Sequence, residues 1–346
     1  MARGGAEKVV TLLANHYIEK GYDVDIVLLL GPEVDYLQYP LSPRIKIIDL
    51  SGKSKSYLQN TIRWLFLIRQ YVKSNNVKCV ISFVGRINAL VLTSTVGLHV
   101  PIVVSERNDP KRDGRSRLML KYCNYIYKRA SRIVFQSKHE QSCFSNKLSS
   151  KAVVIPNPVK AISFDDIVIN NLLISTAGRL NPQKNHPMLI EAIDIIKKVV
   201  PDIRCEIYGE GPERSRLEKL VCDKGLKENV FLPGNKGDVL KYIASSYFFV
   251  LTSNFEGMSN SLLEAMTLGK VCITTDYPGA EEVIQHMYNG VIVPQNSPQA
   301  LADTIIMLLR NQDLCNRLSN NAMQSSTNYS YSAIMRQWDR IIDNYR

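Results

Sequence analysis

Short apolar runs rich in Val, Ile and Phe alternate along the chain with longer segments in which apolar residues recur at helical spacing. This alternation is typical of a mostly parallel sheet with helices on both faces. Two series of strands are predicted, one over residues 24–30, 45–48, 77–83, 101–105, 132–136 and 152–155, the other over 172–177, 203–208, 230–232, 248–252, 271–274 and 291–293. Helices are predicted between the strands, for example over residues 56–74 and 115–128. The pattern therefore predicts an α/β chain of two doubly wound, Rossmann-like halves.

The break between the halves falls at Pro156-Asn157-Pro158, which a polar stretch of low periodicity follows. Two prolines so close together favour an extended connector over a helix. We therefore expect an N-terminal domain of residues 1–157 and a C-terminal domain of residues 158–329. Residues 330–346 are predicted to form an amphipathic helix whose apolar face must pack on a partner, and we expect it to join the N-terminal domain.

The N-terminal half departs from the usual order of a doubly wound domain. Such a domain normally opens with a strand that feeds a glycine-rich turn, but here Gly4 and Gly5 stand almost at the start. The first strand of this half is therefore expected to be missing. Two explanations stay open: an incomplete N-terminus, or a domain that begins with the helix near Ala6.

Composition and charge indicate the compartment of the protein, the state of its cysteines and the charge of its partner. No apolar run approaches the roughly 20 residues of a membrane-spanning helix, and no secretion signal is recognisable, so we expect a cytoplasmic protein. The seven cysteines have no metal-ligand spacing and are expected to be reduced thiols. The net charge is +11, and all of the excess lies in residues 1–155, where 24 Lys and Arg face 11 Asp and Glu. That half suits an anionic partner, although a merely solvated basic face is the alternative.

The segment Phe255-Glu256-Gly257-Met258-Ser259-Asn260-Ser261-Leu262-Leu263-Glu264-Ala265-Met266 carries the strongest chemical signal. It follows a predicted strand, and open α/β sheets bind ligands at the carboxyl ends of their strands. Gly257 allows the backbone to approach a ligand, and Ser259 or Asn260 can cap a helix whose free N–H groups then face an anion. Glu256 on the loop and Glu264 within the helix can both accept hydrogen bonds from hydroxyl groups. The segment is predicted to bind a diphosphate and the sugars on either side of it.

A second segment at a strand end is Ala177-Gly178-Arg179-Leu180-Asn181-Pro182-Gln183-Lys184-Asn185-His186. It places two cations beside a glycine. Arg179 can bind phosphate with two hydrogen bonds and Lys184 as a point charge, so together they would offset the charge that builds up on a departing diphosphate. The alternative is a helix-entry loop with solvated charges.

These motifs resemble those of glycosyltransferase family 4, a retaining family with the GT-B fold of two facing Rossmann-like lobes. The matching pieces span nearly the whole chain in family order: Gly4-Gly5-Ala6-Glu7, Val154-Ile155-Pro156-Asn157, Gly178-Arg179 with Lys184-Asn185, Tyr208-Gly209-Glu210-Gly211-Pro212, Phe231-Leu232-Pro233-Gly234, and the segment from Glu256 to Glu264. Within the family, the chain is most similar in kind to bacterial enzymes that extend lipid-linked oligosaccharides, capsule or O-antigen chains.

The resemblance implies a role for each matching residue. Glu256 would contact the donor sugar, Glu264 the ribose hydroxyls, and Arg179 and Lys184 the diphosphate. The backbone around Phe231 to Gly234, including Leu232, would face the base, and Gly4 and Gly5 would let the N-terminal lobe close over the phosphates. The other residues predicted to bind the donor are Gly178, Gly257, Met258, Ser259 and Asn260.

One position departs from the family pattern. Many relatives have a histidine in the loop after the fourth strand, where this chain has Arg107, so the resemblance assigns no catalytic histidine. The five histidines form no cluster in the sequence, and Asp23-Val24-Asp25 introduces an apolar strand rather than a strand-end loop. We therefore expect no metal and no other cofactor, with the diphosphate charge met by Arg179, Lys184 and helix N-termini.

The expected function is retaining transfer of a hexose or N-acetylhexosamine from a nucleotide sugar, UDP by resemblance, to a glycan acceptor in bacterial surface polysaccharide or glycoprotein glycan assembly. The cations expected on the acceptor or lipid side are Arg107, Lys111, Arg112, Arg115 and Arg117. They would attach a monomeric enzyme to the anionic inner face of the cell membrane. The loop lacks interleaved aromatics, which argues against nucleic acid. A catalytically inactive nucleotide-sugar-binding module is the alternative function.

Overall fold

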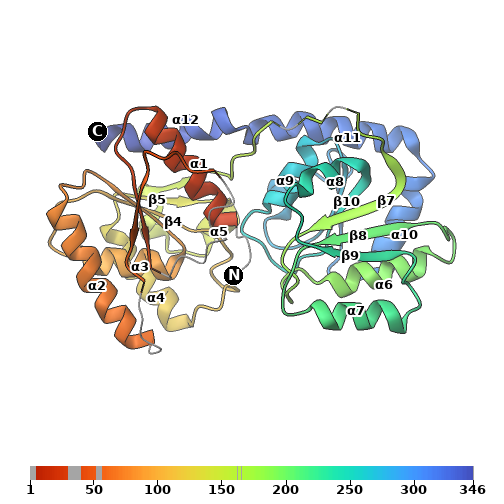
Figure 1. Cartoon of the computed structure of the whole chain (residues 1–346), viewed down its shortest axis with the longest axis horizontal. Helices are drawn as coiled ribbons and strands as arrows, with labels where there is room; N and C mark the ends of the chain where they lie inside the picture. The colour runs from red at the N-terminus through yellow and green to blue at the C-terminus, as the bar shows by residue number, and fades with distance from the viewer. Residues whose placement is uncertain (1–4, 30–39, 52–56, 162, 165, 346) are drawn as a thin grey trace. The chain divides into compact units, whose positions relative to one another are not determined.

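The computed structural model describes residues 5–29, 40–51, 57–161, 163–164 and 166–345. The chain divides into two compact units (Figure 1). One comprises Arg3–Pro158 together with Ile334–Arg346, and the other comprises Val159–Ala333. Within the described ranges, no helix is both long enough and apolar enough to cross a lipid bilayer.

The first unit contains two parallel sheets. After helix α1 (Gly5–Glu19), strands β1 (Asp25–Leu28) and β2 (Lys46–Asp49) form a two-stranded sheet. A four-stranded sheet follows with the order β3-β4-β5-β6, comprising β3 (Val80–Phe83), β4 (Ile102–Ser105), β5 (Arg132–Phe135) and β6 (Ala152–Val154). No strand precedes α1 among the described residues, and Gly4 lies outside them.

Helices cover the four-stranded sheet through a core of aliphatic and aromatic side chains. The helices are α2 (Tyr57–Ser74), α3 (Gly85–Ser94) and α4 (Arg117–Ile126), the last continued by the 3-10 helix η2 (Tyr127–Arg129) and followed by α5 (Lys138–Ser142) and η3 (Asn146–Lys151). The strands are largely β-branched, and β4 is buried along its whole length, as expected for parallel strands between helices.

The second unit is built on one six-stranded parallel sheet of order β12-β11-β10-β7-β8-β9. Its strands are β7 (Asn170–Ala177), β8 (Arg204–Tyr208), β9 (Val230–Gly234), β10 (Ser246–Leu251), β11 (Val271–Thr275) and β12 (Val291–Val293). The covering helices are α6 (His186–Ile196), α7 (Arg214–Asp223), α8 (Val239–Ser245), α9 (Asn260–Thr267), α10 (Pro298–Leu309) and α11 (Gln312–Ser326), with two short 3-10 turns at Ala280–Glu282 and Thr327–Tyr329. Strand order runs outward from β7 in one direction and from β10 in the other, so the sheet reverses between these two strands.

The last helix, α12 (Tyr331–Ile342), ends with a 3-10 turn at Asp343–Tyr345. Its residues from Ile334 onward belong to the first unit. There the ring of Trp338, fully buried, lies 6.3 Å from that of Phe83, and Asp339 lies 2.9 Å from His16 on α1. This part of α12 is therefore an integral part of the first unit's core.

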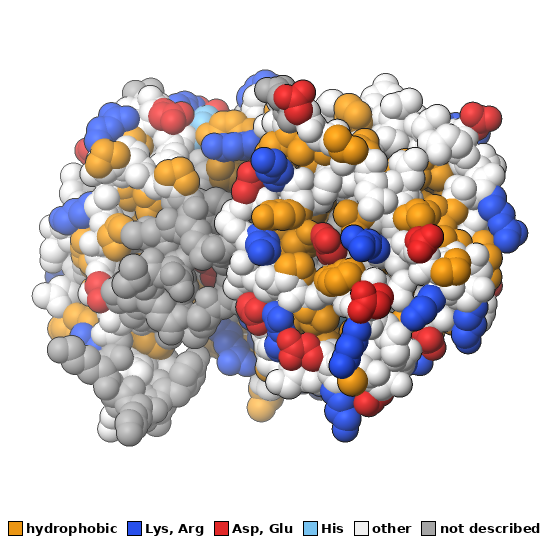
Figure 2. All heavy atoms as spheres, turned by 45° about the vertical axis from the view of Figure 1, so that its right-hand side comes forward, with side chains coloured by type: hydrophobic (Ala, Val, Ile, Leu, Met, Phe, Trp, Pro, Cys, Tyr) orange, Lys and Arg blue, Asp and Glu red, His pale blue; other side chains and the backbone are white. Residues whose placement is uncertain are grey.

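The two predicted series of strands are confirmed, because each predicted run contains or overlaps a strand of the structure. The distribution of charge also differs between the units. On the face of the second unit shown in Figure 2, acidic and basic side chains are interspersed. The basic excess of the chain lies in residues 1–155, which belong almost entirely to the first unit.

Candidate active site

Two loops of the second unit meet where its sheet reverses direction. The loop after β7 covers residues 178–185, and the loop after β10 covers residues 252–259. Because β7 and β10 pair in parallel, both loops leave the same edge of the sheet. This is the topological switch point, where open α/β sheets bind their ligands.

Hydrogen bonds join these two loops. The backbone N–H of Asn254 donates to the carbonyl of Gln183 at 2.8 Å, and the Thr252 hydroxyl donates to the carbonyl of Lys184 at 2.9 Å. The Gln183 side chain donates in turn to the carbonyl of Phe255 at 2.9 Å. The two loops therefore hold one another in place, which gives their side chains a fixed geometry.

Lys184 and Glu256 form an ion pair across the two loops, with Nζ 2.7 Å from Oε1. The Ser253 hydroxyl donates to the same carboxylate oxygen at 2.6 Å. Both side chains are mostly buried, at 14% and 9% exposed. The structure thus brings together two of the three predicted catalytic residues.

Gly178 and Gly209 make room for this arrangement. A Cβ atom on Gly178 would lie 2.9 Å from Cε of Lys184, so the lysine side chain passes directly over this glycine. Gly209 has a φ of +139°, and a Cβ atom there would lie 1.9 Å from the carbonyl oxygen of Gly178. Arg179, the next residue along, is exposed at the mouth of the loop.

Ser259 is the N-cap of α9, and its hydroxyl accepts a hydrogen bond from the backbone N–H of Leu262. Gly257 precedes this cap and Asn260 opens the helix, so the N-terminus of α9 lies at the same sheet edge. Helix N-termini of this kind suit anions, and the role of α9 in binding one stays a prediction. Glu264 lies further along the helix and is 8% exposed. Met258 is also buried and packs with Leu262 in the core, which leaves its backbone as the part that could face a ligand.

His186 opens α6 directly after this loop and is buried. Burial lowers the pKa of His186 to about 3, and the positive charge of Lys184 acts in the same direction. The imidazole is therefore neutral at physiological pH.

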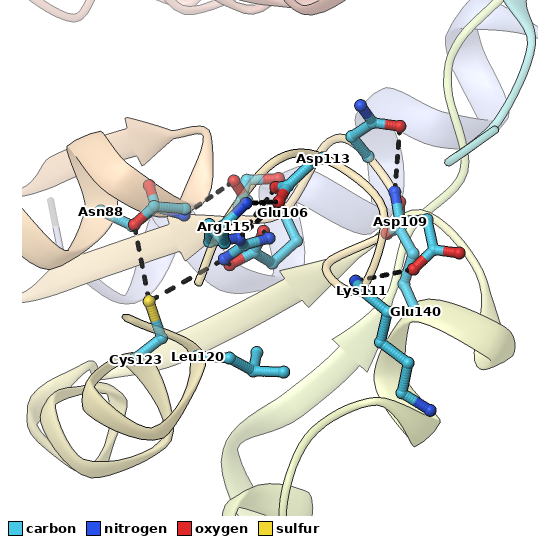
Figure 3. A network of polar contacts seen from close by, with 12 residues as sticks. Asn88, Glu106, Asp109, Lys111, Asp113, Arg115, Leu120, Cys123 and Glu140 are labelled. Atoms are coloured by element: carbon cyan, nitrogen blue, oxygen red, sulfur yellow. Dashed lines mark hydrogen bonds and ion pairs between the residues drawn. The ribbon is translucent and has the colours of Figure 1, made fainter. Parts of the chain in front are cut away.

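In the first unit, the loop after β4 contains the cations that the sequence places on a lipid-facing side. Arg115 is buried instead: its guanidinium donates to Glu106 at 3.0 and 2.7 Å, and it pairs with Asp113 at 2.8 Å (Figure 3). Tyr127 donates a short hydrogen bond to the same Glu106. A Cβ atom on Gly85 would lie 1.8 Å from Nη1 of Arg115, so the arginine packs against this glycine.

Arg107 is also withdrawn from the surface. Its Cζ atom lies 5.1 Å from the ring centre of Phe83 and 5.9 Å from that of Trp338, and Nη1 donates to Asn157 at 2.7 Å. Burial lowers the pKa of Arg107 to about 10, which leaves it charged at neutral pH. Arg115 is thus too deeply buried to face a lipid surface, and Arg107 is half-buried, while Lys111, Arg112 and Arg117 are exposed. A role of these residues on the acceptor side stays a prediction.

Comparison with known proteins identifies the family. The sequence model of "Glycosyltransferase Family 4" matches residues 3–161, and that of "Glycosyl transferases group 1" matches residues 164–325. The chain is a glycosyltransferase with a family 4 domain and a group 1 domain. The two motif-bearing loops lie in the group 1 domain.

Relatives and solved structures agree with this assignment. An uncharacterized glycosyltransferase of Haemophilus influenzae is 23% identical over 98% of this chain and 96% of its own length. The Campylobacter jejuni GalNAc-alpha-(1->4)-GalNAc-alpha-(1->3)-diNAcBac-PP-undecaprenol alpha-1,4-N-acetyl-D-galactosaminyltransferase is 26% identical over 98% of this chain and 95% of its own length. The crystal structure of Anabaena Alr3699/HepE in complex with UDP-glucose has a TM-score of 0.85 at 20% identity, covering 99% of this chain and 96% of that one. The likeness in structure shows that this glycosyltransferase has the GT-B fold.

The positions of three further predicted donor-site residues are as follows. The carbonyl of Leu232 accepts a hydrogen bond of 2.8 Å from Arg214, which also pairs with Glu210 at 2.6 Å. Gly5 is the first residue of α1, and Gly4 lies outside the described residues. The roles of these residues stay predictions.

The sequence did not predict one group of side chains that have the chemistry of metal ligands. Asp109, His139 and Cys143 have ligand atoms within 4.8 Å of one another, although the histidines form no cluster in the sequence. His139 and Cys143 are four residues apart at α5, and that spacing was the available signal. Nε2 of His139 lies 3.5 Å from a carboxylate oxygen of Asp109.

Proposed function

We propose that this glycosyltransferase transfers a hexose or N-acetylhexosamine from a UDP-sugar to a glycan acceptor with retention of the anomeric configuration. The observation that supports the proposal best is the Lys184–Glu256 pair at the switch point, beside the capped N-terminus of α9. A cation and a helix N-terminus at one sheet edge suit a diphosphate, and the carboxylates of Glu256 and Glu264 suit the hydroxyl groups of the sugar and the ribose.

In this proposal Lys184, Arg179 and the first N–H groups of α9 bind the diphosphate, and no metal is required. The bond between the anomeric carbon and the diphosphate oxygen breaks, and the charge that develops on UDP is offset by these donors. The acceptor hydroxyl forms the new bond to the anomeric carbon, and its proton passes to the departing diphosphate oxygen. Glu256 contacts the sugar and positions Lys184, and Glu264 binds the ribose hydroxyls.

The acceptor is proposed to be a lipid-linked glycan in bacterial surface polysaccharide or glycoprotein glycan assembly. The Campylobacter jejuni relative carries an undecaprenol-linked glycan in its name, which supports this class of acceptor. A cytoplasmic enzyme attached peripherally to the inner face of the membrane would meet such an acceptor. Lys111, Arg112 and Arg117 contribute exposed positive charge to this attachment.

A donor screen tests the proposal. Thermal melting of the purified full chain is measured with UDP-glucose, UDP-galactose and their N-acetyl forms, and with GDP-mannose for comparison. A ligand that binds the folded state raises its stability by mass action, by about 2.7 kcal/mol at a concentration 100 times its Kd. Stabilisation by a UDP-sugar and release of UDP on adding a lipid-linked acceptor support the proposal. Stabilisation by none of them, or by GDP-mannose alone, contradicts it.

A further inference from the structure

Helices α2 and α4 of the first unit expose large apolar side chains on the face that points away from the core. On α2, Ile62 is 61% exposed and Phe66 is 68% exposed. On α4, Leu118 is 78% exposed and Tyr125 is 68% exposed. The inner faces of both helices are already apolar and pack in the core. A surface helix normally has a polar outer face, so apolar residues here call for a partner.

The exposed residues follow the same pattern on both helices. Two or three apolar side chains are followed by basic ones, at positions i, i+4, i+7 and i+11, which places them along one face of a helix. The stripes are Ile62, Phe66, Arg69 and Lys73 on α2, and Leu118, Tyr122, Tyr125 and Arg129 on α4 and η2.

Contacts through α3 place the two stripes on one side of the unit. Arg69 donates from α2 to the carbonyls of Ser94 and Val96 at the end of α3. The hydroxyl groups of Tyr122 on α4 and Thr93 on α3 are 2.6 Å apart. The three helices form one layer of the first unit (Figure 1). We call its outer face the α2/α4 surface, defined by Ile62, Phe66, Leu118, Tyr122 and Tyr125 with Lys73, Lys121 and Arg129.

All charged residues on the helices of this layer are basic. Helices α2, α3 and α4 and the η2 turn contain no Asp or Glu. Their basic residues are Arg63, Arg69, Lys73, Arg86, Arg117, Lys121, Lys128 and Arg129. Long basic side chains beside exposed aromatic and leucine side chains are typical of helices that lie in the interface of an anionic bilayer.

We propose that the α2/α4 surface is the membrane-binding face of this protein and that its partner is an anionic phospholipid bilayer. The aromatic and leucine side chains enter the headgroup and acyl boundary, and the flanking lysines and arginines bind lipid phosphates. Charge complementarity favours lipid over a second copy, because two copies of a surface without acidic residues on its helices would repel each other.

This inference rests on the proposed function only in that a lipid-linked acceptor gives the enzyme a reason to meet a membrane. It differs from attachment by the loop after β4 in one respect. Binding through inserted side chains persists when salt screens the charges, whereas purely electrostatic binding is lost as the Debye length falls to about 3 Å at 1 M salt.

Vesicle co-sedimentation of the full chain, without donor or acceptor, tests the proposal. The vesicles contain phosphatidylglycerol and phosphatidylcholine, or phosphatidylcholine alone. A variant with Phe66→Gln, Leu118→Gln and Tyr125→Gln is expected to bind anionic vesicles at least about tenfold more weakly, at low and at high salt. A variant with Lys73→Gln, Lys121→Gln and Arg129→Gln is expected to lose about 100-fold in affinity at low salt and its preference for anionic vesicles.

The matched control replaces exposed apolar residues of the second unit, with Val168→Gln, Val199→Gln and Met307→Gln, and is expected to bind like the unaltered protein. Thermal melting of all variants checks that they fold. Failure of the unaltered protein to bind anionic vesicles overturns the proposal, as does binding of the Phe66, Leu118 and Tyr125 variant within about twofold of it. Dimerisation of the unaltered protein that this variant abolishes would reassign the surface to a second copy. Transfer to a soluble acceptor, unchanged in all variants, is the separate test of the proposed function.

Discussion

Nζ of Lys184 lies 2.7 Å from Oε1 of Glu256, although 72 positions separate the two residues in the chain. The pair exists because strands β7 and β10 are neighbours and their following loops are joined by backbone and side-chain hydrogen bonds. Each residue therefore fixes the other. A substitution of either one removes a hydrogen-bond and ion-pair partner of the other.

The first prediction is that the two residues are coupled in stability. Lys184→Ala and Glu256→Ala should each destabilise the fold, and the double variant should be more stable than the sum of the two losses predicts, by about 0.5–3 kcal/mol. Removing one partner leaves the other charge largely buried, whereas removing both does not. Urea unfolding of the four proteins measures the coupling. Additive losses would show that the two charges do not interact in solution.

The close approach of Gly209 to Gly178 leads to the second prediction. Gly209→Ala should cost at least about 3 kcal/mol, because the new Cβ would clash with a backbone carbonyl and the φ of +139° is strained for alanine. Gly225→Ala is the control, since Gly225 also has a positive φ but no atom lies within 4 Å of the position that its Cβ would take, and it should cost only about 1–2 kcal/mol. Equal melting temperatures for the two variants would contradict the packing described for the donor loops.

The third prediction concerns the buried pair in the first unit. Arg115→Gln should lower the free energy of unfolding by about 3–5 kcal/mol, because it leaves the buried carboxylate of Glu106 without its cation. Arg117→Gln, two positions away and exposed, should change it by less than about 0.5 kcal/mol. Chemical unfolding distinguishes the two. If both substitutions lower the free energy of unfolding by similarly small amounts, Arg115 is not buried in solution.

The fourth prediction is a pH dependence that originates at Glu140. Burial raises the pKa of Glu140 from its ordinary value of 4.5 to about 8. Between these values the folded state holds a proton that the unfolded state has lost, so the contribution of Glu140 to stability declines as the pH rises from about 4.5 to about 8. The slope is about 1.4 kcal/mol per pH unit within that window.

Glu140→Gln should remove this slope. The measurement is the difference in unfolding free energy between the unaltered protein and the variant at pH 5, 6, 7 and 8. The use of a difference cancels the opposite contribution of His186, whose pKa is lowered to about 3 and which therefore reduces stability below about pH 6.5. A difference that stays constant over this range would show that Glu140 is ionised in the folded state.

The fold and the donor loops could be predicted because their signals are local. Runs of β-branched residues bounded by polar segments mark buried parallel strands, and the loops that follow β7 and β10 carry their own glycines and charges. The cap at Ser259 is likewise a property of a few consecutive residues. The separation of β1 and β2 into a sheet of their own could not be predicted, because pairing partners are not local.

The sequence could not predict which of the cations after β4 are buried and which are exposed. Arg107 and Arg115 stand among Lys111, Arg112 and Arg117 without any local distinction. Their burial depends on distant residues: Trp338 and Phe83 for Arg107, and Gly85 for Arg115. The exposure of the apolar residues on the α2/α4 surface could not be predicted from the sequence for a related reason. A helix that is apolar on both faces has a periodicity that does not tell the inner face from the outer one.

The central claim is that the Lys184–Glu256 pair belongs to the donor site of a UDP-sugar transferase. The most direct measurement is the rate of UDP release from a UDP-sugar in the presence of acceptor, for the unaltered protein, Glu256→Gln, Lys184→Ala and the control Lys224→Ala. Lys224 pairs with Asp194 at 3.1 Å in the same unit, between the ends of α6 and α7. Glu256→Gln and Lys184→Ala should each lower the rate by about 100-fold or more with folding retained, and Lys224→Ala should leave it unchanged. Rates within about tenfold of the unaltered protein for both site variants would contradict the account.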